Sequence, residues 1–434
     1  MRRSFVHLAA TNLGGAGIAA ERLHEALRDA GDESHLVIHR GAARDPSIIE
    51  THSPLSDLLI TASKAYFRAT SVPKYHFRNQ QLSNPGIGRI SRLVKELRPD
   101  AIISYFITSY LSFQDVHAIQ QAAGAPVIWF LMDMATLTGG CHYSWECRGY
   151  EQGCGSCPAL IGRRGPNDHS ARTCRSKAHY LDRIESVVVS GSSWLAGQAR
   201  ASALFRDRRI EVIPLGVSPE LFRPRDRAEL RLRLGLDPAR PLIFLGARDA
   251  SDPRKGMALL VEALGRIAAT SARDSLPGLL IAGDAPAVER LKRLGYPVRT
   301  LGLVGPGDLA EAYAAADLFV SPSIEDSGPM MVNEAVMSGT PVVSFPIGVA
   351  LDLVKPGETG EFARSGDSES LAAALTRVLA WPPEKRDAAT GSARAFAVRT
   401  FSPAAQAERI VGLADDLGGR LARNSGLGGD HGFS

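Results

Sequence analysis

Short apolar runs alternate with helical patterns along almost the whole chain. The runs are rich in Val, Ile, Leu and Phe, which is typical of strands buried on both faces of a parallel sheet. Strands are expected at 5–10, 35–39, 101–105, 127–131, 187–189, 210–213, 242–246, 279–282, 318–321 and 342–345. Helices are expected at 16–30, 90–97, 113–123, 193–204, 257–269, 309–316, 330–337, 371–379 and 403–422. This alternation predicts doubly wound α/β sheets.

The alternation breaks at a segment rich in Pro and Gly, PLGVSPELFRP, and then starts again. A chain of 434 residues is also too long for one ordinary core. We therefore expect two Rossmann-like domains, 1–213 and 214–402, that face each other across a cleft. The helix at 403–422 is expected to pack back on the first domain, and the Gly-rich tail 423–434 is expected to be disordered.

Composition and charge exclude several classes of protein. The net charge of +4 is far weaker than a nucleic-acid-binding protein usually shows. No apolar run is long enough to span a membrane, and we interpret the start, MRRSFVHLAATNLGG, as a first strand and not as a signal peptide. We expect a cytoplasmic protein, where five cysteines do not form a disulfide framework.

Several carboxylates and small residues lie in the stretch SPSIEDSGPMMVNEAVMSGTP. Its pattern predicts the end of a strand, a loop and a short helix. A helix N-terminus offers N–H donors and a positive dipole end to a phosphate, and carboxylates suit the hydroxyls of a sugar or ribose. The residues expected to bind a donor here are Glu325, Asp326, Ser327, Gly328 and Glu334.

Polar or small residues follow other predicted strands as well. Gly14 and Gly15 follow the first strand, and Asp133 follows the strand at 127–131. Arg248 and Lys255 lie in the loop ARDASDPRKG, where two cations would neutralise a departing diphosphate. Ligands of open α/β sheets bind at the carboxyl ends of strands, so we expect these residues to surround one site.

An insertion at 138–160 carries four cysteines in the pattern C-x5-C-x6-C-x2-C. The closing C-x2-C is a common half-site for zinc, so a structural zinc is predicted. Disulfides, free buried thiols or an iron–sulfur cluster are alternatives. Cys174 is interpreted as a buried bystander. The expected zinc ligands are Cys141, Cys147, Cys154 and Cys157.

A basic and aromatic stretch at 64–78 has two interpretations. It is either an ordinary surface helix and loop, which we favour, or a peripheral contact with an anionic membrane or a lipid-linked acceptor. The second interpretation would place the protein at the inner face of the cytoplasmic membrane.

Taken together, residues 4–415 resemble the retaining nucleotide-sugar glycosyltransferases of glycosyltransferase family 4, which have the two-Rossmann GT-B fold. The resemblance rests on GGAGIAAERLHEAL, SGSSWLAGQARASALF, VIPLGVSPELFRP, DPRKGMALLVEAL and AADLFVSPSIEDSGPMMVNEAVMSGTPVVSF. The insertion TGGCHY…GCGSCP is similar to the exopolysaccharide, colanic-acid-type branch of that family.

The resemblance implies roles for individual residues. Glu334 matches the second glutamate of the family's E-x7-E signature, which binds the ribose, and Asp326 takes the position that contacts the transferred sugar. Lys255 matches the lysine at the donor phosphates, and Arg248 is a looser match to its arginine partner. Gly15 matches the first-loop glycine near the donor phosphate and the acceptor.

The chain departs from the family pattern at two site positions. Asp326 is shorter than the usual glutamate, with Glu325 beside it as a substitute. Met132 stands where the family has a histidine close to the transferred sugar, which puts sugar handling in question.

The resemblance also implies a reaction. A hexosyl group would move with retention from a UDP- or GDP-linked donor to a polysaccharide or lipid-linked glycan. No Asp-x-Asp element is present, so no divalent metal or other cofactor is expected in catalysis. A non-catalytic nucleotide-sugar-binding relative, a sugar-nucleotide epimerase and a glucan phosphorylase-like enzyme are weaker alternatives.

Overall fold

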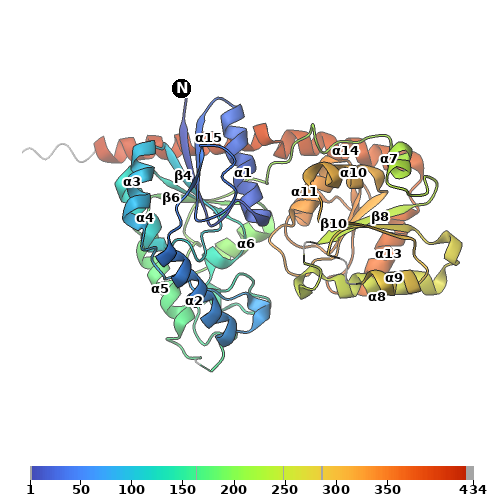
Figure 1. Cartoon of the computed structure of the whole chain (residues 1–434), viewed down its shortest axis with the longest axis horizontal. Coiled ribbons are helices and arrows are strands. Elements are labelled where there is room, and N and C mark those ends of the chain that lie inside the picture. Colours follow the sequence, from blue (N-terminus) through green and yellow to red (C-terminus); the bar gives the residue numbers. More distant parts are fainter. Residues whose placement is uncertain (1, 163, 248, 285–286, 427–434) are drawn as a thin grey trace, which may run out of the picture. The chain divides into compact units, whose positions relative to one another are not determined.

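The protein is described by a computed structural model that covers residues 2–162, 164–247, 249–284 and 287–426 (Figure 1). The chain divides into two compact units. Unit 1 comprises 1–191, 195–216 and 403–434, and unit 2 comprises 192–194 and 217–402. The main division therefore lies three residues after the expected boundary at 213.

Unit 1 is built around a parallel sheet. Within the described residues, its strand order is β3-β2-β1-β4-β5-β6-β7, and each neighbouring pair runs parallel. The strands are β1 (Ser4–Ala9), β2 (Glu33–Ile38), β3 (Ile48–Glu50), β4 (Ala101–Ser104), β5 (Val127–Leu131), β6 (Ser186–Ser190) and β7 (Ile210–Val212). The helices are α1 (Gly14–Asp29), α2 (Pro54–Thr70), α3 (Ile87–Leu97), α4 (Phe113–Ala123), α5 (His169–Leu181), α6 (Ser193–Ala201) and α15 (Pro403–Gly426).

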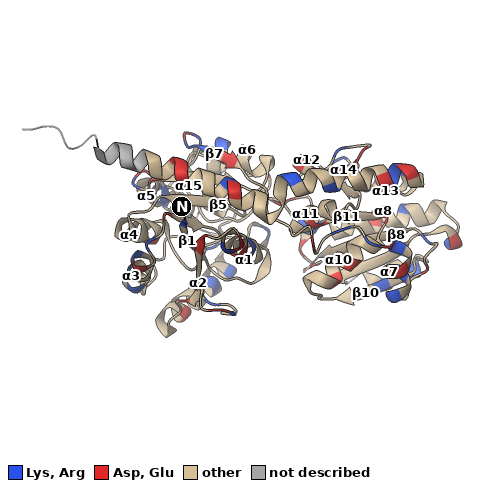
Figure 2. Ribbon diagram, turned by 90° about the horizontal axis from the view of Figure 1, so that it is seen from above, with Lys and Arg blue, Asp and Glu red and all other residues tan. Residues whose placement is uncertain are grey.

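Unit 2 repeats this architecture with a second parallel sheet, whose order is β10-β9-β8-β11-β12-β13. Figure 2 shows Lys and Arg interspersed with Asp and Glu along its helices. The strands are β8 (Leu242–Ala247), β9 (Gly278–Gly283), β10 (Val298–Gly302), β11 (Leu318–Ser321), β12 (Val342–Ser344) and β13 (Gly360–Phe362). The helices are α7 (Arg227–Arg233), α8 (Met257–Thr270), α9 (Val288–Arg293), α10 (Pro306–Ala315), α11 (Met330–Met337), α12 (Ala350–Leu353), α13 (Ser368–Leu379) and α14 (Pro383–Phe401).

Strand order reverses direction at one point in each sheet. In unit 1 the chain winds outward from β1 to β2 and β3, and then returns to place β4 on the other side of β1. In unit 2 the same reversal separates β8 from β11. Loops that leave the carboxyl ends of two such strands turn to opposite faces, which opens a crevice for a ligand.

The C-terminal helix α15 belongs to unit 1 and packs on α1. The Arg209 guanidinium lies 3.3 Å from the Asp416 carboxylate, and the Gln406 side chain accepts a hydrogen bond of 3.0 Å from the Gly216 backbone N–H. α15 reaches Gly426, so it passes the end expected at 422. The expected disordered tail therefore begins inside this helix, and its residues 427–434 lie outside the described residues.

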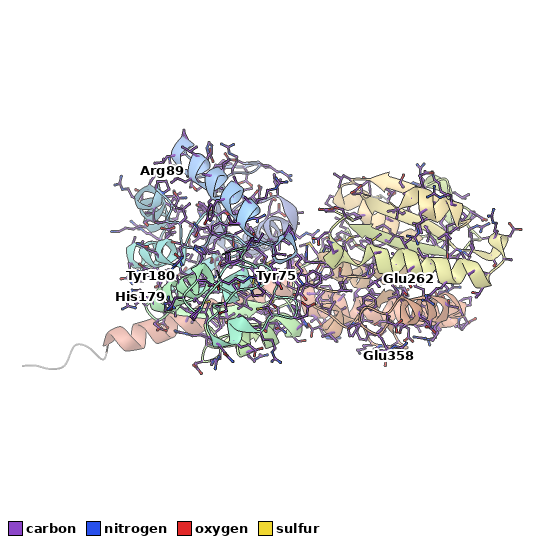
Figure 3. All side chains as sticks on the ribbon, turned by 90° about the horizontal axis from the view of Figure 1, so that it is seen from below. Tyr75, Arg89, His179, Tyr180, Glu262 and Glu358 are labelled. Carbon is purple, nitrogen blue, oxygen red and sulfur yellow. The ribbon has the colours of Figure 1, made fainter. Side chains whose placement is uncertain are left out.

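Two other expectations need correction. α6 ends at Ala201 and not at residue 204. The stretch at 64–78 is not one surface, because Phe67, Tyr75 and Phe77 are buried together in a small hydrophobic cluster of unit 1. Tyr75 is labelled in Figure 3. Of its aromatic side chains, Tyr66 is exposed.

A buried row of polar side chains links β1, β2, β4 and α1. His7 is hydrogen-bonded to Tyr105 (3.1 Å) and to Ser34 (2.9 Å), and Ser34 is also bonded to His24 (2.8 Å). His24 in turn reaches Ser47 at 3.0 Å. Burial holds the pKa of His7 well below its usual value and lowers the pKa of His24 to about 4. Both imidazoles are therefore neutral in the folded protein at pH 7.

Acidification is expected to destabilise unit 1 through His24. In the unfolded chain this group titrates near pH 6.5, so between pH 6.5 and 4 the unfolded state binds more protons and the free energy of unfolding falls. The difference in pKa corresponds to a loss of about 2 kcal/mol at pH 5. Urea unfolding at pH 7, 6 and 5 measures it. His24→Gln should flatten this dependence, whereas the exposed His179→Gln should not; equal slopes in all three proteins would contradict the assignment.

Candidate functional site

The strand reversal of unit 2 brings two polar loops together. One loop follows β8 and ends in the short 3-10 turn Pro253–Lys255, and the other follows β11 and carries Glu325 and Asp326. The Lys255 Nζ atom lies 2.6 Å from the Asp326 Oδ2 atom, and the Asp326 side chain is buried. Two residues predicted separately from sequence thus form one ion pair. Arg248, the expected second cation, lies outside the described residues.

Close backbone packing holds the two loops in register. Gly256 adopts a φ of +64°, and a Cβ atom at this position would lie 1.8 Å from the Pro322 carbonyl oxygen, so only glycine fits. The buried Arg254 side chain donates to the Glu325 carbonyl at 3.2 Å, and the Ile324 N–H donates to the Arg254 carbonyl at 2.8 Å. Lys255 is therefore carried by a rigid turn.

The loop after β11 leads directly into α11. The Gly328 N–H donates to the Asp326 Oδ1 atom at 3.2 Å, so both carboxylate oxygens of Asp326 are engaged. Ser327 lies between these residues. Glu334, on α11, is buried and accepts a hydrogen bond of 3.3 Å from the Tyr313 hydroxyl.

Sequence reasoning missed Tyr313. A signal was present, because a tyrosine among the alanines of α10 needs a partner for its hydroxyl when it is buried.

In unit 1 the glycines after β1 differ in backbone geometry and in the space around them. Gly14 begins α1 with a φ of +77°. A Cβ atom at Gly15 would meet nothing within 4 Å, so this position is open. The glycine that the fold requires is Gly17, where a Cβ atom would lie 2.5 Å from the Thr11 carbonyl oxygen. The sequence pattern alone did not separate these glycines.

Asp133, at the carboxyl end of β5, is held by a histidine from the insertion. Its Oδ1 atom accepts from the Ala135 N–H at 2.7 Å, and its Oδ2 atom lies 2.7 Å from the His142 Nδ1 atom. Both side chains are buried, and the His142 ring packs 5.1 Å from the ring of Phe106, which follows β4. Among the described residues the His142 Nε2 atom has no hydrogen-bond partner. The sequence analysis assigned no role to His142.

A buried lysine ties the loop after β5 to α5. The Lys177 ammonium donates to the carbonyl oxygens of Ala135 (2.6 Å) and Thr138 (2.7 Å) and to the Gln80 side chain. Complete burial lowers its pKa to about 8. Because Ala135 and Thr138 belong to the loop that carries Asp133, Lys177 helps to position that carboxylate. It was not predicted.

The four cysteines of the insertion are free thiols, and Cys141 and Cys157 are buried. Burial raises the pKa of Cys157 to about 11, so this thiol is protonated. Within the described part of the chain, no three His, Cys, Asp or Glu side chains are grouped closely enough to hold a metal ion. The zinc site therefore stays a prediction, without support from this arrangement. Cys174 is buried, as expected, and interaction with Cys154 lowers the pKa of its thiol.

Part of unit 2 matches a known protein family. Residues 239–380 match the family of glycosyl transferases group 1. D-inositol 3-phosphate glycosyltransferase of Nocardia farcinica is 32% identical over 39% of this chain and 40% of its own length. Phosphatidyl-myo-inositol mannosyltransferase of Mycobacterium leprae is 30% identical over 51% of this chain and 60% of its own length. The chain thus matches about half the length of these relatives.

Solved structures match over nearly the whole chain. Anabaena HepE in complex with UDP-glucose superposes with a TM-score of 0.66 and 17% identity, over 96% of this chain and all of its own. The glycosyltransferase WaaG, involved in lipopolysaccharide biosynthesis, gives a TM-score of 0.61 and 15% identity over 95% of this chain and 99% of its own. The predicted fold of two Rossmann-like domains of the GT-B type is confirmed. Residues 239–380 thus carry the sequence of glycosyl transferases group 1, on a chain with the GT-B fold.

Proposed function

We propose that the protein is a retaining glycosyltransferase that moves a hexosyl group from a UDP- or GDP-linked sugar to a polysaccharide or lipid-linked glycan. The observation that carries the proposal is the Lys255–Asp326 ion pair at the strand reversal of unit 2, within the segment that matches glycosyl transferases group 1.

Each group of the site has a role in this proposal. Lys255, with Arg248, stabilises the charge that develops on the diphosphate as the bond from the anomeric carbon to the phosphate oxygen breaks. Asp326 and Glu325 hold hydroxyls of the transferred sugar, and Glu334 holds the ribose. Ser327 and Gly328 bring the loop backbone close to the donor. The acceptor oxygen bonds to the anomeric carbon on the face that the nucleotide leaves, and its proton passes to the departing phosphate.

The Lys255–Asp326 pair also suggests how the site is organised before the donor binds. Asp326 keeps the ammonium pointed into the site when no phosphate is present, so little reorganisation is needed on binding. The donor diphosphate then competes with this carboxylate for Lys255. Asp326 can turn one oxygen toward a sugar hydroxyl at the same time, because Gly328 continues to hold the other.

In unit 1 we propose that Gly14, Gly15 and Asp133 are donor-binding residues. The open space at Gly15 allows close approach of a ligand to the backbone. An exopolysaccharide acceptor rests on the resemblance of the insertion alone. A cytoplasmic location accords with the five free thiols of the described structure.

Lys255→Met and Glu334→Gln are expected to lower kcat/KM for a nucleotide sugar by about a hundredfold or more, because each removes a group that meets the donor. A thermal-shift screen first identifies the donor. The value of kcat/KM is then measured from the release of UDP or GDP, with and without acceptor. Lys292→Met, at an exposed lysine on α9, is the matched control and should leave the rate unchanged. Equal rates in Lys255→Met and Lys292→Met would contradict the site, and binding of no nucleotide sugar at all would contradict the function.

Transfer is expected to continue in EDTA, because Lys255 and Arg248 take the place of a divalent metal at the diphosphate. The initial rate should change less than about twofold between EDTA and Mg²⁺. Circular dichroism in the same buffers controls for loss of fold. A rate that vanishes in EDTA and returns with Mg²⁺ or Mn²⁺, while the spectrum stays constant, would refute metal-independent transfer.

A further inference from the structure

A small cavity lies in unit 1 next to the segments that follow β4 and β5. Its volume of about 10 Å³ is close to the space that one water molecule or one hydroxyl group needs. Much of its wall is apolar, with Phe106 and Met132 among its residues, but Gln80, Thr108 and Asp133 line it as well. Ligands of open α/β sheets bind beyond the carboxyl ends of strands, so the cavity lies where a ligand group can be held.

The side-chain amide of Gln80 has one end without a partner. Gln80 is 8% exposed, and its Oε1 atom accepts a hydrogen bond from the Lys177 ammonium. An ammonium group can only donate, so this contact decides which end of the amide faces Lys177. Among the described residues the opposite end, the Nε2 atom, has no hydrogen-bond partner. A buried N–H donor of this kind is costly unless an acceptor meets it.

Hydrogen bonds to α5 hold this amide in place. Lys177 is itself fixed by the carbonyl oxygens of Ala135 and Thr138, as described above. The neighbouring Gln81 side chain donates to the buried Thr173 hydroxyl at 2.9 Å. The Gln80 donor is therefore positioned before any ligand arrives.

Asp133 supplies an acceptor to the same cavity. Its Oδ1 atom accepts from the Ala135 N–H and its Oδ2 atom is bonded to His142, each at 2.7 Å. Each carboxylate oxygen has two lone pairs, so both can accept a second hydrogen bond. A donor and an acceptor thus line one space of the size of a hydroxyl group.

We propose that this cavity binds one hydroxyl group of a sugar, which accepts a hydrogen bond from Gln80 and donates one to Asp133. The proposal rests on the proposed function, which supplies two sources of such a hydroxyl, the transferred sugar and the acceptor glycan. A hydroxyl has one donor and two lone pairs, so it satisfies both residues at once. A phosphate or carboxylate is too large for the cavity and is repelled by the Asp133 charge.

Gln80 is then a specificity-determining residue. A sugar that lacks this hydroxyl leaves a buried donor and a buried acceptor unpaired, and sites built in this way reject the deoxy analogue strongly. A water molecule is the other group that fits the cavity. In that case Gln80 would serve the fold alone and would not discriminate between sugars.

The substitution Gln80→Glu separates these two cases. It keeps an oxygen toward Lys177 and the length of the side chain, but it replaces the N–H donor by a second oxygen. The value of kcat/KM is measured in two series. The first is hydrolysis, without acceptor, of the donor found by the nucleotide-sugar screen and of its monodeoxy analogues. The second is transfer from the intact donor to methyl hexopyranosides and their monodeoxy analogues.

In the wild type, removal of one particular hydroxyl is expected to lower kcat/KM about a hundredfold or more. The series in which this occurs identifies the source of the hydroxyl. Gln80→Glu should lower kcat/KM for the intact sugar about tenfold or more, and for that deoxy analogue less than about threefold. Gln80→Met, which removes the donor with an apolar chain of similar length, should lose the same discrimination.

Gln121→Glu is the matched control, because it makes the same substitution at an exposed position on α4. It should follow the wild type with every sugar. Gln80 variants that lower the thermal midpoint and slow all sugars equally would overturn the proposal in favour of a bound water. A wild type that turns over nucleotide sugars but shows no sensitive hydroxyl in either series would overturn it too, and would leave the proposed function intact. Turnover of no nucleotide sugar at all would contradict the proposed function itself.

Discussion

The reversal of strand order between β8 and β11 creates the crevice of unit 2 in which open α/β sheets bind ligands. Among the described strands of unit 2, β8 and β11 are the adjacent pair whose loops leave the same edge of the sheet and turn to opposite faces. Lys255 and Asp326 lie on these two loops, and they meet at 2.6 Å although 71 positions separate them in sequence. The ion pair is thus a consequence of the topology, and Gly256 lets the loops approach closely enough to form it.

In unit 1 the carboxylate at the end of a strand is held by a residue from an insertion, and not by the loop of a neighbouring strand. The loop after β5 carries Asp133, whose carboxylate is held by the Ala135 N–H and by His142 of the Cys-rich insertion, while Lys177 of α5 binds carbonyl oxygens of the same loop. Lys177 and His142 are both buried, and an unmade hydrogen bond at such a depth is costly. The insertion therefore serves to order a strand-end loop through its histidine, whatever the cysteines bind.

Much of the fold could be predicted from the sequence because most strands coincide with an apolar run. The strands β3, β10 and β13 were missed because polar residues or glycine interrupt their short apolar runs, IIE, VRTLG and GEF. Helix α14 was missed because its buried positions are largely alanines, Ala389, Ala393 and Ala397, which carry little hydrophobic signal. Helix α2 has apolar residues, but Leu55, Leu58 and Tyr66 are exposed, so its hydrophobic pattern does not mark a buried face. No helix of the described residues is long and apolar enough to cross a membrane.

The site was predicted where loops follow strands, and not where partners lie far apart in sequence. Asp326, Glu334 and Lys255 stand at positions that a strand–loop–helix pattern marks. Tyr313 and Lys177 stand at no such position, since Tyr313 meets Glu334 and Lys177 meets Ala135 only after the helices have packed. Local patterns contain no information on such contacts.

Hydrogen exchange measured by mass spectrometry, with and without a saturating nucleotide sugar, tests the central claim most directly. If the strand reversal of unit 2 is the donor site, backbone amides at 253–256 and 322–334 will exchange more slowly with the ligand bound. Protection confined to other parts of the chain, with unchanged exchange in these two loops, would contradict the account.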